Sequence, residues 1–435
     1  MIKIRPRLVV VVALLSIAAV NTPAQKARKF DIEQWRDVLR IVKGELKSSY
    51  YDPTFHGMNI DARFELADEK MKNAESLDQL VGIVAQVLLD LNDSHTYFLP
   101  PYNLTRVDYG WQIRPVGADC YVGAVRPGSD AEGKGLQLGD KVLSIDGRPL
   151  DRTKVWLADY LYNTLRPQSS MALVVEKPDK SQQRIVIKAK IDEGSPIVTY
   201  HNRLEWDLEA EENDHLTRHR FQELSEDVLV WKMPQFDLGE GSLARTFDRF
   251  RKRKALILDL RGNYGGSVRS LELLTGYFFE SKVKLADRRG RKGFDSVFAR
   301  NQKVNVFKGQ LIVLIDGESK SAAEVFARVM QLEKRGTVIG DRSAGFVMQS
   351  IWRPLHVGVK EGLAFAISAT DADIIMSDGK SLEHVGVTPD ELLLPTAQDM
   401  RLNHDPVLAY AASLVGIKLD PKKAGELFPV EWKSR

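Results

Sequence analysis

Apolar residues recur at helical spacing near the start of the chain. Between residues 31 and 49 they fall three or four positions apart, as Ile32, Trp35, Val38, Leu39, Val42 and Leu46. This is the pattern of an amphipathic helix. A second helix is expected after Ser76, because Gln79 three residues later completes a capping-box pattern and an apolar run continues to Leu91. The polar turn "NDSHTYFLPP" then ends in two prolines, so residues 30–104 are expected to form a helical N-terminal domain.

The pattern changes after residue 105. Short β-rich runs alternate with Gly/Pro turns, and one helical stretch at 153–165 interrupts the series of "CYVGAV", "DKVLSIDG", "MALVVEK" and "QRIVIKA". Several short strands separated by turn residues are typical of a small β module. We therefore expect a β domain over 105–190.

From residue 225 onward, apolar runs of strand length alternate with helical patterns. The runs are "DVLVWKM", "ALILDL", "QLIVLID" and "GTVIG", and helices are expected from Ser267 and from Ser321. Alternating strands and helices indicate an α/β domain with a layered core. The sequence therefore predicts the α/β fold class, with a third domain over 191–435.

The composition narrows the possible partners. The 435 residues are 43% hydrophobic and 28% charged, with a formal net charge of +3. A charge this small and mixed does not indicate a nucleic-acid partner, and the basic cluster at 251–254 is interpreted as a solvated loop. The only cysteine is Cys120, and the eight histidines form no spaced cluster with carboxylates. We therefore expect no intrachain disulfide, no metal site and no cofactor.

The N-terminus has the three-part order of a secretory signal. A basic start, "MIKIRPR", precedes the apolar run "LVVVVALLSIAAV" and the small residues of "NTPAQ". Residues 1–24 are therefore interpreted as a signal peptide cleaved after Ala24. The apolar run is shorter than the roughly 20 residues of a spanning helix, so no stable membrane span is expected after cleavage. An exported chain without disulfides fits a bacterial periplasm or the exterior.

The stretch "DGESKSAAEVFARVMQ" places Ser319, Lys320 and Ser321 between an expected strand and an expected helix. A serine at such a turn has two physical interpretations. Its oxygen can cap the helix by accepting a hydrogen bond from a free amide, or the turn can present the hydroxyl as a nucleophile beside helix N-terminal amides. The local pattern leaves both open. A Gly-rich turn, "LDLRGNYGG", can likewise be structural or can supply an amide to an oxyanion.

One segment resembles the core of a PDZ domain from bacterial proteases. It is "VGAVRPGSDAEGKGLQLGDKVLSIDGRPL", in which a strand is followed by Pro-Gly-Ser, a Gly-Leu pair, Gly-Asp and "VLSIDG". PDZ domains bind extended peptide C-termini by adding a strand to a sheet edge. The resemblance implies polypeptide substrates engaged by this PDZ-like domain; the alternative is a β module that only braces its neighbour.

Four linked motifs resemble the serine peptidases of the carboxyl-terminal processing (tail-specific) and tricorn group. They are, in order, "LDLRGNYGG", "LIDGESKSAAEVFA", "VIGDRSAGFVMQ" and "GVTPD". The resemblance implies a crotonase-like α/β peptidase core over 191–435. It also implies hydrolysis of peptide bonds in unfolded or flexible polypeptide tails.

One position distinguishes the carboxyl-terminal processing branch of this group from the tricorn-type branch. In the carboxyl-terminal processing branch, a Ser–Lys dyad uses a lysine in a "GKG" context, and Phe346 occupies that position here. A phenyl ring cannot accept a proton. Lys320, beside the serine, is expected to point elsewhere, and Arg342 stays protonated and cannot act as a base.

The tricorn-type branch uses a Ser–His pair supported by a second Ser and a Glu. This resemblance implies that Ser321 is the nucleophile and His95 the general base, because an "SH" pair stands at the end of the helical domain. It further implies that Ser94 and Glu383 orient the imidazole. Ser319 is then a cap or a bystander.

The same resemblance assigns the oxyanion donors to the amides of Gly265, or its neighbour Gly266, and Ala322. Two other functions stay open. One is a non-catalytic peptide- or lipid-binding protein on a peptidase scaffold, which the missing lysine favours. The other is an assembly module without chemistry.

Overall fold

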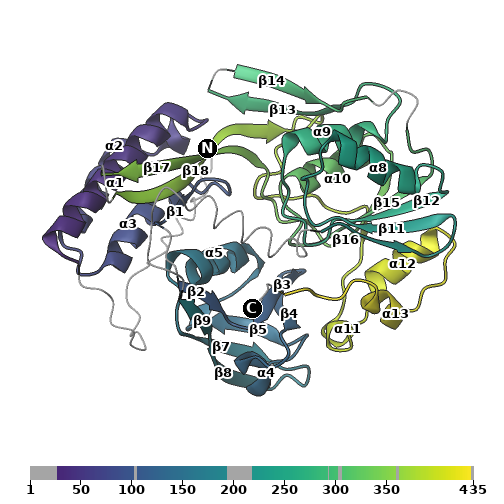
Figure 1. Cartoon of the computed structure of the whole chain (residues 1–435), viewed down its shortest axis with the longest axis horizontal. Coiled ribbons are helices and arrows are strands. Elements are labelled where there is room, and N and C mark those ends of the chain that lie inside the picture. Colours follow the sequence, from purple (N-terminus) through teal and green to yellow (C-terminus); the bar gives the residue numbers. More distant parts are fainter. Residues whose placement is uncertain are drawn as a thin grey trace, which may run out of the picture.

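The computed structural model describes residues 27–101, 105–193, 218–291, 293–301, 306–358 and 362–432. The expected signal peptide at 1–24 lies outside these residues. Figure 1 shows three groups of elements, with helices at one end, a small sheet below and a layered α/β part at the other end. In the part of the chain that the structure describes, no helix has the length and apolarity to cross a membrane.

Three helices form the N-terminal group: α1 (Lys29–Ser49), α2 (Ile60–Lys72) and α3 (Leu77–Leu89). The capping serine expected for the second predicted helix is present, since the Ser76 side chain accepts a hydrogen bond from Gln79 N. The sequence pattern did not predict α2, which Asn59 caps in the same way through Ala62 N. The apolar stripes of the three helices face one another in a shared core.

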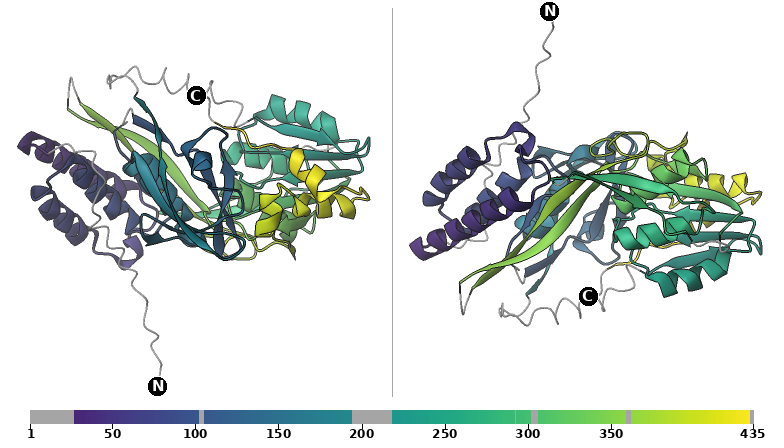
Figure 2. Two further views of the ribbon diagram at one scale, coloured as in Figure 1. Left: turned by 90° about the horizontal axis from the view of Figure 1, so that it is seen from below. Right: turned by 90° about the horizontal axis from the view of Figure 1, so that it is seen from above.

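Strands from the other end of the chain complete that core. Phe365, Ile367 and Ala369 pack among the residues of α1–α3, and they lie on the longest strand of an antiparallel sheet. The sheet has the order β1-β18-β13-β14, with β17 also paired to β18, and consists of β1 (Tyr97–Leu99), β13 (Lys284–Gly290), β14 (Gly293–Phe298), β17 (Met348–Val357) and β18 (Leu363–Ile375). Figure 2 shows these long strands between the helices and the α/β part. Pairing of Tyr97 with Ser368 fixes the turn that precedes β1.

A separate six-stranded antiparallel sheet occupies residues 111–188. Its order is β3-β4-β5-β7-β8 with β6 on β5, and its strands are β3 (Trp111–Val116), β4 (Asp119–Val125), β5 (Lys141–Ile145), β6 (Arg148–Pro149), β7 (Ser170–Glu176) and β8 (Gln182–Lys188). Burial alternates along β4 and β7, as expected for strands with one face in a core. The short helices α4 (Asp130–Gly133) and α5 (Val155–Tyr160) lie in the connections, and β2 (Thr105–Asp108) pairs with β9 (Lys190–Glu193). Among the strands that the structure describes, β3 pairs only with β4 and is therefore an edge strand.

The α/β part is built on a six-stranded sheet. Its order is β10-β11-β12-β15-β16-β19, formed by β10 (Arg220–Glu223), β11 (Val228–Lys232), β12 (Ala255–Asp259), β15 (Gln310–Ile315), β16 (Thr337–Gly340) and β19 (Glu391–Leu392). All pairs are parallel except β10 with β11. Every residue of β12 is buried, which explains its continuous apolar run.

Helices cover both faces of this sheet (Figure 1). Alternate strand residues such as Trp231, Leu258 and Val313 pack with α8 (Glu240–Phe250), α9 (Val268–Gly276) and α10 (Ala322–Leu332). The intervening residues, such as Ile257 and Ile312, pack with α12 (Pro406–Leu414) and α13 (Pro421–Glu426), which follow the short α11 (Ala397–Arg401). Because β12 and β15 are parallel and in register, the turns after their carboxyl ends lie at one edge, where α/β sheets place their sites.

Candidate active site

Ser321 lies in the turn between β15 and α10 in a backbone conformation that is uncommon for a residue with a side chain. Its φ is 55° and its ψ is −117°, in a region that costs an ordinary residue free energy. The hydroxyl lies near the Glu324 amide, as in a capping box, but makes no capping hydrogen bond to it. A serine held in a strained strand-to-helix turn is the geometry that presents a nucleophile.

Ser319 has a structural role instead. Its side chain is fully buried. The hydroxyl donates to Leu260 O at 2.8 Å and accepts a hydrogen bond from Asp316 N at 2.9 Å. It therefore ties the end of β12 to the end of β15 and is closed to a substrate.

A buried carboxylate supports the turn from below. Glu324, with no exposed surface, accepts hydrogen bonds from Ser321 N (3.0 Å), Ser343 Oγ (2.6 Å), Gly345 N (2.7 Å) and Phe346 N (2.9 Å). Burial outweighs these donors and raises the pKa of Glu324 to about 7. Sequence reasoning missed this residue, although its place three positions after Ser321 is the capping-box spacing.

The Gly-rich turn after β12 packs directly against the serine. A Cβ placed on Gly265 would lie 2.6 Å from the Cβ of Ser321, and one on Gly266 would lie 2.4 Å from the carbonyl oxygen of Phe236. Both glycines have positive φ angles, 90° and 134°. Only glycine allows the two turns to approach so closely.

The amides that lack a hydrogen-bond partner here differ in part from the oxyanion donors expected from the sequence. Gly265 N donates to Asn263 Oδ1 at 2.8 Å in the protein interior, so this amide is already engaged. The amides of Gly266 and Ala322 have no hydrogen-bond partner among the described residues. Of the predicted donors, Gly266 and Ala322 are therefore the pair available to an oxyanion, while Gly265 provides the close approach.

His95 lies at the end of a hydrogen-bonded chain of side chains. Its Nδ1 is 2.8 Å from Ser94 Oγ, and the Ser94 hydroxyl lies 2.9 Å from Glu383 Oε2. Ser94 N donates to the second carboxylate oxygen, also at 2.9 Å. An ionised carboxylate only accepts, so the Ser94 hydroxyl donates a hydrogen bond to Glu383 and accepts a hydrogen bond from His95 Nδ1–H. This arrangement leaves His95 Nε2 with its lone pair free, as a general base requires.

The turn that carries His95 is fixed by Asp93. This carboxylate accepts hydrogen bonds from His95 N (2.8 Å), Thr370 Oγ1 (2.7 Å) and Tyr50 OH (3.0 Å). Burial lowers the pKa of His95 to about 4, against the attraction of Asp93 and with a further lowering by Lys320. The imidazole is therefore neutral at neutral pH.

The backbone of Phe346 and Val347 connects Glu383, the acid that supports His95, to Ser321. Val347 N donates to Glu383 Oε2 at 2.8 Å, and Ser321 N donates to Phe346 O at 2.9 Å. No direct hydrogen bond between His95 and Ser321 is present in the described residues. The structure thus joins Ser94, Glu383 and His95 directly and brings Ser321 to them through the backbone of 346–347.

Phe346 occupies one side of this region. Its ring is partly buried and makes an edge contact with Trp156 of α5, with the ring centroids 6.1 Å apart. The Lys320 ammonium lies 5.7 Å from the same ring. Within the described ranges, no lysine forms a hydrogen bond with Ser321, so nothing in the geometry resembles a Ser–Lys dyad.

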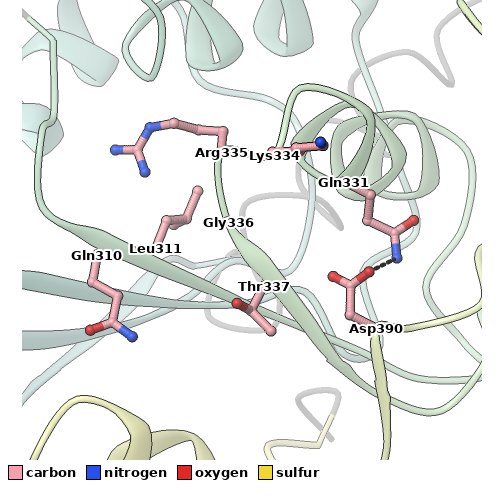
Figure 3. A pocket seen from close by; sticks show the side chains of 8 residues that line it. All are labelled: Gln310, Leu311, Gln331, Lys334, Arg335, Gly336, Thr337 and Asp390. Carbon is pink, nitrogen blue, oxygen red and sulfur yellow. Dashed lines mark hydrogen bonds between the residues drawn. The ribbon is translucent and has the colours of Figure 1, made fainter.

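A hollow on the surface lies away from this region. It has a volume of about 380 Å³ and is lined by Gln310, Leu311, Gln331, Lys334, Arg335, Gly336, Thr337 and Asp390. Figure 3 shows these side chains and the hydrogen bond from Gln331 Nε2 to Asp390 Oδ1, which is 3.0 Å long. The hollow lies where β15 and β16 begin, opposite the carboxyl ends that carry Ser321. The described part of the chain also contains no group of three or more His, Cys, Asp or Glu side chains that could hold a metal ion.

Comparison with known proteins finds similarity to peptidases. Residues 227–393, which include Ser321 and Glu383, match the model of peptidase family S41. The tail-specific protease of Haemophilus influenzae is 25% identical over 350 residues, covering 75% of this chain and 46% of that protein. The chain thus spans about half the length of that relative.

Two further relatives align over most of the chain. The carboxyl-terminal-processing protease of a Picosynechococcus species is 23% identical, covering 87% of this chain and 88% of that protein. A putative tricorn protease homolog 2 of Streptomyces coelicolor is 24% identical, covering 88% of this chain and 32% of that protein.

Solved structures share the fold. Mature CPAF superposes with a TM-score of 0.65 at 14% identity, covering 90% of this chain and 97% of that one. The photosystem II D1 C-terminal processing protease gives a TM-score of 0.53 at 18% identity, covering 91% and 99%. The family match, the relatives and the shared fold lead to one conclusion. Residues 227–393 resemble peptidase family S41, and the chain is similar over most of its length to tail-specific and carboxyl-terminal processing proteases.

Proposed function

We propose that this protein is an exported serine endopeptidase that hydrolyses peptide bonds in unfolded or flexible polypeptide tails by a Ser–His mechanism. One observation carries the mechanism. The chain from Glu383 through Ser94 to His95 is tied, through Val347 and Phe346, to the backbone of Ser321. Nucleophile, base and orienting groups are the parts that acyl transfer requires.

In the proposed reaction, Ser321 Oγ attacks the carbonyl carbon of the scissile peptide while His95 Nε2 takes its proton. The oxyanion accepts hydrogen bonds from the amides of Gly266 and Ala322. The imidazolium then gives its proton to the departing amine, which leaves an ester on Ser321. Water, deprotonated by His95, hydrolyses this ester and restores the serine.

The hydrogen bonds to His95 matter because the imidazole is neutral before the reaction and must become charged during it. Burial lowers the pKa of His95 to about 4, so forming the imidazolium costs free energy. The Glu383 carboxylate, acting through the Ser94 hydroxyl, offsets part of this cost as the proton arrives. Glu383 therefore acts as a positioning and electrostatic group, not as a proton acceptor.

The substrate class rests on the middle sheet and on the relatives. The unpaired edge of β3 offers main-chain hydrogen bonds to an extended peptide, and the relatives are named for tail-specific and carboxyl-terminal processing. We infer a PDZ-like domain over 105–190 that engages polypeptide ends, between a helical domain at 30–104 and a crotonase-like core at 191–435. Export is inferred from the signal-like residues 1–24 and fits a periplasmic or secreted protein.

A second function is favoured by one observation. Phe346 occupies the position at which a carboxyl-terminal processing peptidase has its lysine, and no lysine replaces that group at Ser321 within the described residues. A protein that has lost its base could retain the scaffold as a peptide- or lipid-binding protein. The two functions differ in whether Ser321 reacts.

A fluorophosphonate probe and an unfolded polypeptide substrate distinguish these functions. We expect the native protein to be labelled and to cleave the polypeptide, and we expect Ser321→Ala to do neither. Ser413→Ala, at an exposed position of α12, is the matched control and should behave as the native protein does. A native protein that is folded, unlabelled and inactive against every unfolded polypeptide would favour the binding protein.

A further inference from the structure

Lys320 is rigidly placed beside the nucleophile. Its backbone N donates to Asn263 O at 2.8 Å, and its carbonyl accepts a hydrogen bond from Ala323 N at 3.1 Å. The ammonium lies 5.4 Å from the centroid of the Tyr264 ring and 5.7 Å from that of Phe346. Tyr264 belongs to the Gly-rich turn and Phe346 to the segment that contacts Glu324, so the cation lies between the two walls of the site.

This ammonium has no carboxylate partner among the described residues. That is unusual for a partly buried lysine in this protein, because Lys177 pairs with Asp140 and Lys232 with Asp259, at 2.7 Å and 3.3 Å. Aromatic rings attract a cation through their faces, but they leave its N–H donors without acceptors. A partly buried cation of this kind is a place where an anionic ligand gains a charge-assisted hydrogen bond.

Glu318, an acid that Lys320 attracts electrostatically, supplies only part of a counter-charge. Burial and the neighbouring Asp316 raise the pKa of Glu318 to about 7, in spite of attraction by Lys320 and Arg114. Near neutral pH, Glu318 is therefore partly protonated. Its carboxyl is also outside ion-pair distance of the Lys320 ammonium, as judged over the described residues.

We propose that Lys320 binds a carboxylate of the substrate close to the scissile bond, so that the enzyme prefers polypeptides with an acidic group at that place. Because Lys320 is adjacent to Ser321 in the chain, the carboxylate belongs to a residue next to the cleaved bond or to its near neighbour. Two sources share this chemistry: an Asp or Glu side chain, and the free α-carboxylate of a polypeptide end. This inference rests on the proposed peptidase function.

The test begins with cleavage sites mapped by mass spectrometry in an unfolded protein digested by the native enzyme. Matched peptides are then made around one site, in pairs that carry Glu or Gln beside the bond. A further pair ends nearby in an α-carboxylate or in an amide. We expect kcat/KM to favour the carboxylate member of one pair or of both by roughly tenfold, mainly through KM. The pair that shows the preference identifies the source.

Variants of Lys320 assign the preference. Lys320→Met, of similar length and without charge, should bring the ratio within each pair close to one, whereas Lys320→Arg should retain it. Fluorophosphonate labelling of each variant shows that the site is still assembled. The inference is wrong if native enzyme cleaves both members of each pair equally, or if Lys320→Met keeps the preference. Absence of any cleavage by the native protein would instead count against the peptidase function itself.

Discussion

The two halves of the proposed active site, one around Ser321 and one around His95, are built by different means. On the Ser321 side, the backbone positions the reacting groups: Ser321 has a φ of 55°, two glycines have positive φ angles, and two amides have no hydrogen-bond partner among the described residues. On the His95 side, side chains position the base, because Asp93, Ser94 and Glu383 hold His95 through hydrogen bonds of 2.8–2.9 Å. The halves should therefore fail in different ways. Added atoms should damage the first, and lost hydrogen-bond partners should damage the second.

Among changes to the residues that support Ser321 and His95, the largest effect is expected from one added methyl group on the Ser321 side. In Gly265→Ala, the new Cβ would lie 2.6 Å from the Cβ of Ser321, so the serine must shift. A displacement of about 1 Å can cost on the order of 10²-fold in rate, and we expect kcat/KM for peptide hydrolysis to fall by at least that much.

Gly262→Ala is the matched control in the same turn. Gly262 also has a positive φ, of 69°, but a Cβ there meets no atom within 4 Å. It should lose about 1–2 kcal/mol of stability and retain most of its activity. Equal loss of activity in Gly265→Ala and Gly262→Ala would show that backbone strain in the turn, and not contact with Ser321, causes the loss of activity.

A smaller effect is expected from removing partners on the His95 side. Ser94→Ala deletes the bridge between His95 and Glu383, and Glu383→Gln keeps its shape but removes its charge. A hydrogen bond to a charged group contributes about 1.5–3 kcal/mol, so each variant should lose roughly 10- to 100-fold in kcat/KM. His384→Asn should lose less, because the His384 ring contacts Asn92 O and lies 3.6 Å from Glu383 Oε1 without forming a hydrogen bond with Ser94 or His95 in the described residues. A severe loss in His384→Asn with full activity in Glu383→Gln would contradict the assignment of Glu383.

The pH dependence of activity separates a buried base from an exposed one. With the pKa of His95 lowered to about 4, the acid limb of kcat/KM should lie well below the ordinary histidine value of about 6.5. The enzyme should then keep most of its activity at pH 5, where a base of ordinary pKa would lose roughly 30-fold. An acid limb centred near pH 6.5 would show that His95 is more hydrated than its burial implies.

The smallest effect concerns stability and Glu324. Its pKa is raised from 4.5 to about 7 in the folded protein, so the folded state holds a proton that the unfolded state releases between these values. Stability should therefore fall as the pH rises through this window. Urea unfolding at pH 5 and pH 8 should show a fall of about 2–3 kcal/mol in the native protein and a smaller one in Glu324→Gln. An equal fall in both would assign the pH dependence to other groups.

Much of the fold follows from the sequence because buried strands and capped helices leave local patterns. The apolar runs of β11, β12, β15 and β16 were predicted since both of their faces are covered. The long strand β17 was not predicted, because exposed and half-buried residues mix along it from Ile351 onward and its apolar side chains contact the helical core only in the folded chain. The long strand β18 was not predicted either.

The candidate site divides in the same way. Ser321 and the glycines follow recognisable turn patterns, and the resemblance to known peptidases suggested His95, Ser94 and Glu383. The hydrogen bond between Ser94 and Glu383 joins residues 289 positions apart, so no local pattern contains it. Glu324 and the engaged amide of Gly265 were missed because both depend on which donor faces which acceptor in the folded turn.

The central claim is that Ser321 and His95 act as one unit, and peptide hydrolysis by the two single variants and the double variant tests it most directly. Each protein is first checked for folding by circular dichroism. His95→Ala and Ser321→Ala should each lose at least the 10²- to 10⁴-fold typical of a general base, and the double variant should be scarcely worse than either. Undiminished hydrolysis by folded His95→Ala, or losses that multiply in the double variant, would contradict the Ser–His mechanism.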